Sequence, residues 1–242
     1  MKNPYGIAAD GALVTVDAVE RGLACNCHCP ACGQRLQAHH GASRRAYFSH
    51  YRGADCGLGY ETALHMLAKE VIAAEGRLLL PELVAESDRS IAAVGSFLET
   101  RVLVPPWRRQ RFDVVTLEKS ERTFRPDLTL AVGGRRLFVE IHVTHRVDRE
   151  KLSKIESRGV GTIEFDFSRT RRSLTSDDLK RVLVDTYAAK GRGRGTWVYH
   201  PELRSTQAEL TARYRDRNAL LLRGRAAPVS GACNAYARAK GR

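Results

Sequence analysis

The stretch RPDLTLAVGGRRLFVEIH, residues 125–142, decides the expected fold of this chain. It predicts two strands, over residues 127–132 and 137–144, joined by a turn at Gly133-Gly134, a pair that suits a two-residue hairpin loop. In that loop Val132 pairs with Arg135, and the same register sets Asp127 directly opposite Glu140. One face of the hairpin is then continuously apolar and carries Leu128, Leu130, Leu137, Val139 and Ile141.

The two acids of this hairpin form a candidate metal site. Facing residues on paired strands have Cβ atoms ~4.5–5.5 Å apart, which lets the Asp127 and Glu140 carboxylates share a divalent cation, Mg²⁺ or Mn²⁺. His142 points to the same face as Glu140, because strand side chains alternate. The alternative is a pair of solvated edge-strand acids bonded to Arg125 or Arg136. The pairing in register favours the metal site.

The flanking sequence predicts an α/β domain. Apolar residues at helical spacing over 60–75 end at Gly76, and Asp148 is a predicted N-cap for a helix through residue 158. The remaining expected elements are strands over 78–80, 96–104, 112–117, 162–167 and 196–200, and helices over 176–187 and 201–222. A helix followed by three strands, a helix, a strand and a helix describes a mixed sheet flanked by helices.

Cysteine and histidine residues cluster before this domain. Five of the six cysteines lie within residues 25–56, and Cys29-Pro30-Ala31-Cys32-Gly33 is a metal-binding knuckle. His50 and Cys56 fit best as the second pair of ligands to a structural Zn²⁺. Other residues of the stretch could replace any one of these ligands: Cys25, Cys27, His28, His39 and His40. Ordinary thiols without a metal are the other interpretation.

Composition points to a polyanionic partner. The chain carries a formal net charge of +13, and residues 189–242 contribute most of it, which favours nucleic acid contact over a merely solubilising surface. Lys190–Gly195 is expected to be a flexible linker, and the residues beyond 223 a loosely ordered basic tail. The sequence shows neither an apolar run of ~20 residues nor a secretory signal, so we expect no membrane partner and a cytoplasmic location.

The Asp127 and Glu140 motifs resemble the core of the PD-(D/E)xK nucleases, which have a restriction-endonuclease-like fold. The resemblance implies that Asp127 and Glu140 bind magnesium, and that Glu61, on the upstream helix, adds a third acid. His65 and Lys69 follow Glu61 at i+4 and i+8 on the same helix face. His142 stands where the family usually has Lys. Candidates for a displaced cation are Lys69, Lys151 and Lys154.

The order of motifs also resembles that of the CoiA-like competence proteins, from residue 24 to 168. CPACG, YFSH, ETALH and VEIH carry this likeness. It implies a zinc-binding region at 1–57 and a nuclease domain at 58–188. The basic extension at 189–242, which the charge of that segment indicates, is a difference from the family. The implied function is metal-dependent hydrolysis of DNA. The alternatives are a catalytically inactive DNA-binding protein with the same fold, and an adaptor that binds proteins through its zinc knuckle.

Overall fold

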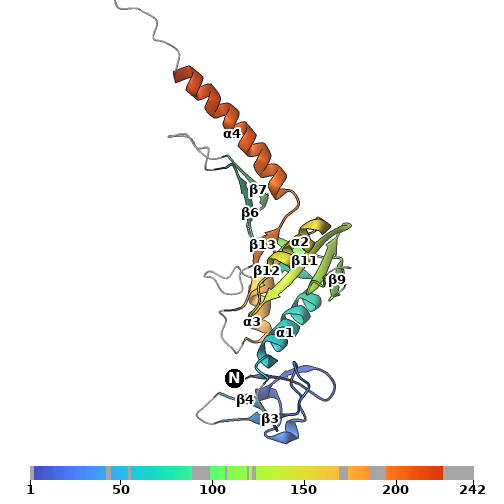
Figure 1. Cartoon of the computed structure of the whole chain (residues 1–242). Helices are drawn as coiled ribbons and strands as arrows, with labels where there is room; N and C mark the ends of the chain where they lie inside the picture. Colours follow the sequence, from blue (N-terminus) through green and yellow to red (C-terminus); the bar gives the residue numbers. More distant parts are fainter. Residues whose placement is uncertain are drawn as a thin grey trace, which may run out of the picture. The chain divides into compact units, whose positions relative to one another are not determined.

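The computed structural model forms two compact units (Figure 1). The first unit consists of the described parts of residues 1–83 and 104–201, and the second of those of residues 84–103 and 202–225. The structure describes residues 3–41, 45–53, 56–88, 99–106, 108–118, 120–121, 124–168, 174–185 and 195–225. Most of the expected linker and the residues beyond 225 lie outside these ranges.

A five-stranded mixed sheet organises the first unit, so the predicted α/β class is confirmed. Its order is β13-β12-β11-β10-β9, with β11 and β12 parallel and the other neighbours antiparallel. The strands are β9 (Val114–Leu117), β10 (Leu128–Val132), β11 (Arg135–His142), β12 (Gly161–Asp166) and β13 (Gly195–Tyr199). The edge strand β13 lies beyond the boundary expected at residue 188. The three-part division of the sequence stays a prediction.

The hairpin of β10 and β11 has the predicted register. Val132 pairs with Arg135 and Leu128 with Val139. Gly133 and Gly134 have φ values of 54° and 76°, the left-handed backbone that a tight two-residue loop requires at both positions. The turn therefore fixes which residues of the two strands face each other.

Three helical segments accompany this sheet, and their ends follow from local sequence. The helix α1 (Gly59–Glu75) ends at Gly76, whose φ is 57°. The helix α2 (Arg149–Arg158) begins after Asp148, whose side chain accepts a hydrogen bond from the Lys151 N–H. The short α3 (Ser176–Lys180) continues into a π-helical turn, η4 (Arg181–Asp185).

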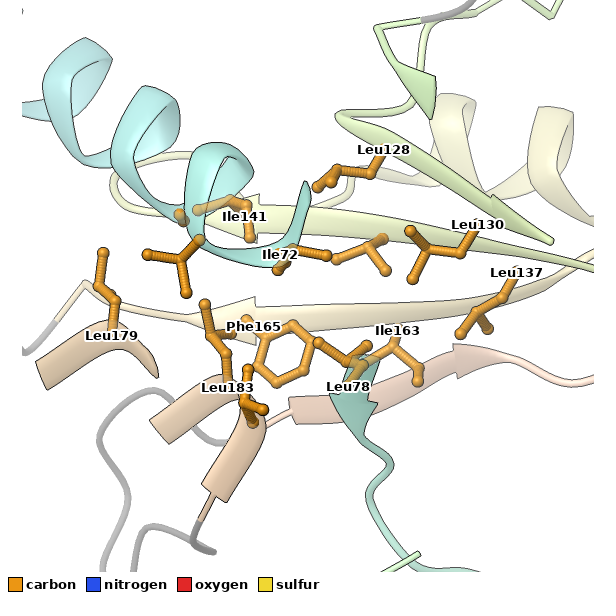
Figure 2. Close-up of a cluster of buried hydrophobic side chains, with 14 of the residues drawn as sticks. Ile72, Leu78, Leu128, Leu130, Leu137, Ile141, Ile163, Phe165, Leu179 and Leu183 are labelled. Carbon is orange, nitrogen blue, oxygen red and sulfur yellow. The ribbon is translucent and has the colours of Figure 1, made fainter. Parts of the chain in front are cut away.

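The main core lies between the sheet, α1, α3 and η4 (Figure 2). Ile72 of α1, Leu179 of α3 and Leu183 of η4 point toward the apolar face of the strands. All five hairpin residues expected on this face belong to the core: Leu128, Leu130, Leu137, Val139 and Ile141. The opposite face is buried as well, since Phe138, Glu140 and His142 of β11 are each at most 5% exposed.

The N-terminal region has a small core of its own. It combines two antiparallel pairs: β1 (Tyr5–Ile7) with β2 (Leu13–Thr15), and β3 (Leu36–His39) with β4 (Tyr47–His50). Two short 3₁₀ turns join them, η1 (Val16–Ala18) and η2 (Leu23–Cys25). Phe48 and Leu36 are 2% exposed and pack with buried cysteines. We call this region, residues 3–57, the zinc module.

Two shorter strand pairs, β5 with β8 and β6 with β7, complete the described chain. In the first unit β5 (Arg77–Leu79) pairs with β8 (Arg109–Arg111). The second unit contains β6 (Leu83–Glu86), β7 (Thr100–Val104) and α4 (Leu203–Arg225). There Arg101 donates two hydrogen bonds to the Glu209 carboxylate, and Tyr214 is fully buried. None of the described helices has the length and apolarity to cross a bilayer.

Candidate metal centres

Four side chains of the zinc module converge on one point. The ligand atoms of Cys29, Cys32, His50 and Cys56 all lie within 4.8 Å of one another. The Cys29 and Cys56 sulfurs are 3.6 Å apart, and Cys32 Sγ is 3.2 Å from His50 Nε2. Tetrahedral zinc with bonds of ~2.3 Å to sulfur places two sulfurs roughly 3.8 Å apart. The cluster could therefore hold a structural metal such as zinc.

Backbone geometry brings these ligands together. In the knuckle, the Gly33 N–H donates to the Cys29 carbonyl at 2.9 Å, and the Gly33 φ of 69° is one that glycine tolerates. The strand β4 delivers His50, and Cys56 lies three residues before α1. The ligand set is thus fixed by a turn, a hairpin and the start of a helix.

The other cysteines of the module lie outside the cluster. The Cys27 thiol donates to the Cys25 carbonyl at 3.1 Å, and the Cys25 thiol to the Leu36 carbonyl at 3.6 Å. Burial raises the pKa of Cys27 to about 12, so it remains a thiol near neutral pH. These contacts favour the four-residue set over the replacements that the sequence left open.

The cluster touches the first turn of α1. A Cβ atom on Gly59 would lie 3.2 Å from Cys29 Sγ and 2.9 Å from Asn3 Nδ2, closer than side chains normally pack. The missing side chain lets the helix begin against the metal ligands. The start of α1, the helix that carries Glu61, His65 and Lys69, therefore packs closely against Cys29 and Asn3 of the zinc module.

Asp127 lies one residue before β10, next to the last pair of the hairpin register, Leu128 with Val139. Its carboxylate accepts a hydrogen bond from the Ile141 N–H at 2.8 Å and lies 2.9 Å from Lys69 Nζ and 3.5 Å from His65 Nδ1. Burial alone would raise the pKa of Asp127, but the hydrogen bonds and cationic neighbours hold it well below its usual range. Asp127 is therefore a charged carboxylate held by α1.

Glu140 is the most deeply buried acid of the pair, with 4% of its surface exposed. Its Oε2 lies 2.6 Å from Lys151 Nζ of α2, while Oε1 has no hydrogen-bond partner among the described residues. Burial raises the pKa of Glu140 to about 7; Lys151 opposes this shift, and Asp127 and Glu164 add to it. An unsatisfied buried oxygen of this kind fits a proton or a hard cation such as Mg²⁺.

Glu61 belongs to an open pocket of about 340 Å³ beside α1. Its carboxylate accepts a hydrogen bond from the Thr144 hydroxyl. The pocket is lined by Leu58, Glu61, Thr62, His65, Lys69 and His145. The spacing of Glu61, His65 and Lys69 thus places them on one helix face, as predicted. Within the described chain, however, only the zinc module has three or more metal-ligating side chains gathered within 4.8 Å.

His142 takes part in a contact that the sequence analysis did not foresee. It is 5% exposed, and its Nδ1 lies 3.1 Å from Asp166 Oδ1 without the alignment of a hydrogen bond. In the parallel register Glu140 pairs with Glu164 and His142 with Asp166.

The acids on β12 and at the edge of the sheet also bind backbone or cationic groups. Glu164 accepts a hydrogen bond from the Val147 N–H at 2.8 Å. Glu118, before the predicted motif, shares Lys69 with Asp127, at 2.9 Å from each. The acidic site, defined as Glu61, Asp127 and Glu140 with Lys69 and Lys151, is therefore an ion-pair network at the ends of β10 and β11.

Comparisons of the chain with protein-family models, with curated proteins and with solved structures give no match. Function is therefore inferred from the geometry of the two centres: a thiolate and imidazole cluster suited to a structural metal, and an oxygen-rich site with lysines.

Proposed function

We propose that this protein is a metal-dependent nuclease of the PD-(D/E)xK type that hydrolyses DNA, with the zinc module of the CoiA-like proteins. The observation that carries the proposal is the buried Oε1 of Glu140, which has no hydrogen-bond partner among the described residues. It lies next to the end of the hairpin register, where Leu128 pairs with Val139 and Asp127 precedes Leu128. Asp127 and Glu140 would hold Mg²⁺ or Mn²⁺, and Glu61 would complete the site from α1. The bound ion would activate water and stabilise charge on the phosphate.

Lysines near both acids support this assignment. In the family a Lys follows the Glu on the same strand, whereas here Lys151 reaches Glu140 from α2 at 2.6 Å. Lys154, the neighbouring candidate, pairs with Glu150 on the exposed side of α2 instead. Lys151 is therefore the residue that replaces the motif lysine in our proposal, and His142 packs beside Asp166.

A specific observation also favours a second candidate, an inactive nuclease fold that binds DNA. Lys69 balances the charge of Asp127, and Lys151 that of Glu140. These lysines offset the carboxylate charges without a divalent ion. In this candidate the basic residues of α4 and the tail hold nucleic acid, and the acids maintain the fold.

Plasmid cleavage separates the two candidates. Supercoiled and linear DNA are incubated with the full chain and Mg²⁺ or Mn²⁺, alongside Asp127→Asn and Glu140→Gln. We expect each substitution to reduce cleavage at least ~100-fold, since each removes a charged ligand of the ion. Asp113→Asn is the matched control, because Asp113 is an exposed acid beside the Gly133 turn, at the other end of β10. Cleavage that survives both substitutions contradicts the site, and DNA binding without any cleavage favours the inactive candidate.

A further inference from the structure

The β3–β4 hairpin of the zinc module has one polar face. In β3 and β4, Leu36 pairs with His50 and Ala38 with Phe48, and Leu36, Ala38 and Phe48 are buried. Strand side chains alternate, so the intervening residues face outward. The Tyr51 N–H donates to the Arg35 carbonyl at 2.9 Å, which extends the register by one pair. The outward face therefore consists of Arg35, Gln37, His39, Tyr47, Ser49 and Tyr51.

This hairpin face carries flat aromatic groups at both ends. The rings of His39 and Tyr47 stack with centroids 4.7 Å apart and planes 15° from parallel. Ser49 Oγ lies 2.7 Å from His39 Nε2 and so fixes the imidazole. At the other end Tyr51 is 41% exposed, and the Arg52 guanidinium lies 5.2 Å from its ring centroid. Tyr51 therefore offers an exposed ring beside a guanidinium, while His39 and Tyr47 are half-buried.

The sequence around the hairpin face is rich in basic residues. Residues 21–54 contain five arginines, four histidines and no aspartate or glutamate, although the whole chain has 27 acids. Arg45 and Arg52 are exposed at the hairpin, and Arg35 donates to the Leu23 carbonyl beside it. Basic residues beside aromatic groups suit a polyanion that also has planar bases.

We infer that the hairpin face binds single-stranded nucleic acid, with Tyr51 stacking on a base and Arg45 and Arg52 contacting phosphates. Duplex DNA fits less well, since its bases are stacked on one another and cannot reach a ring on the protein surface. This surface is separate from the acidic site and requires no cleavage. It would hold an unpaired strand at the zinc module whether or not the chain is a nuclease.

Fluorescence anisotropy of the zinc-loaded full chain tests the inference, with labelled oligothymidylate or oligouridylate and without Mg²⁺. Stacking of one base on an aromatic ring supports an expected loss of at least about fivefold in affinity for Tyr51→Ala, while Tyr51→Trp keeps the binding. Arg52→Ala should weaken binding and lower the slope of log affinity against log salt by about 0.7, the value for one phosphate contact on a single strand. The tighter of the two oligonucleotides identifies DNA or RNA as the partner.

Two controls make the result decisive. Zinc content is measured for each variant, because Tyr51 follows the ligand His50. Arg135→Ala removes an exposed arginine at the β10–β11 turn. This variant should bind the oligonucleotides as tightly as the unchanged chain. Wild-type affinity in zinc-loaded Tyr51→Ala and Arg52→Ala, an equal loss for duplex DNA, or equal competition by polyglutamate would each overturn the inference. Asp127→Asn tests the nuclease separately, since it should abolish cleavage and leave this binding unchanged.

Discussion

The zinc module and the acidic site bring metal-ligating side chains together in opposite ways. In the module four ligand atoms converge within 4.8 Å, and the backbone of a knuckle, a hairpin and a helix start holds them. In the acidic site a lysine lies beside each carboxylate of the hairpin: Lys69, shared with Glu118, is 2.9 Å from Asp127, and Lys151 is 2.6 Å from Glu140. Thiols are neutral when protonated and can gather without a cation, whereas neighbouring carboxylates repel each other. The first centre is thus built by backbone geometry and the second by ion pairs.

The largest expected effect follows from removing a ligand of the cluster. Cys29→Ser should release bound zinc and destabilise β3 and β4, because metal binding supplies ~10–16 kcal/mol in small zinc domains. Metal analysis and amide hydrogen exchange of the purified chain measure both losses. Cys25→Ser is the matched control and should retain zinc, since Cys25 bonds to the Leu36 carbonyl outside the cluster. Full zinc retention in Cys29→Ser would reject the assignment.

Lys69→Met tests whether ion pairs stabilise the acidic site. Lys69 is buried with only 11% of its side chain exposed, and its removal leaves Asp127 without its nearest cation. Breaking a buried ion pair costs about 3–5 kcal/mol, which urea unfolding at neutral pH would register. Lys154→Met, which removes an exposed pair with Glu150, should cost ~0.5 kcal/mol or less.

Added Mg²⁺ then sharpens the contrast between the two centres. If a divalent ion takes the place of the Lys69 ammonium, it should stabilise Lys69→Met more than the unchanged chain. Equal stabilities of Lys69→Met and Lys154→Met would contradict the ion-pair account of the acidic site.

The acidic site should also make stability depend on pH. The pKa of Glu140 rises from its ordinary 4.5 to about 7 on folding, so the folded chain binds more protons than the unfolded chain between these values. Stability should therefore fall as pH rises through this window, by up to ~3 kcal/mol. Folding lowers the pKa of Asp127 from its ordinary 3.8. Its contribution to stability is therefore constant at higher pH and is lost only as the pH falls below 3.8. Urea midpoints at pH 5 and pH 8 measure the fall, which Glu140→Gln should lack.

The pH prediction has a clear negative outcome. If the stability of Glu140→Gln decreased by the same amount between pH 5 and pH 8, another group would have to titrate in this pH range. Loss of zinc would lower stability by a separate route, so zinc content must be measured at both pH values.

Local rules of sequence predicted the hairpin and the ligand cluster well. Gly133 and Gly134 determined the register of β10 and β11, and the spacing of Cys29 and Cys32 defined the knuckle. The partners of the acids were harder to predict, because they come from distant segments. Lys151 was one of three candidate lysines, and only the packing of α2 brings it to Glu140. The pairing of His142 with Asp166 depends on a parallel register that no turn encodes.

The smallest effect concerns the start of α2, which supplies the lysine of Glu140. Asp148 accepts a hydrogen bond from the Lys151 N–H at 2.8 Å, so Asp148→Ala should cost about 1 kcal/mol, typical of a lost N-cap. Asp148→Ser, which keeps an acceptor, should restore most of it. The loss should appear in urea unfolding while zinc content stays unchanged, because the cluster shares no contact with this cap. A drop in zinc content in Asp148→Ala would mean that the two centres are coupled. It would contradict the view that backbone geometry holds one centre and ion pairs hold the other independently.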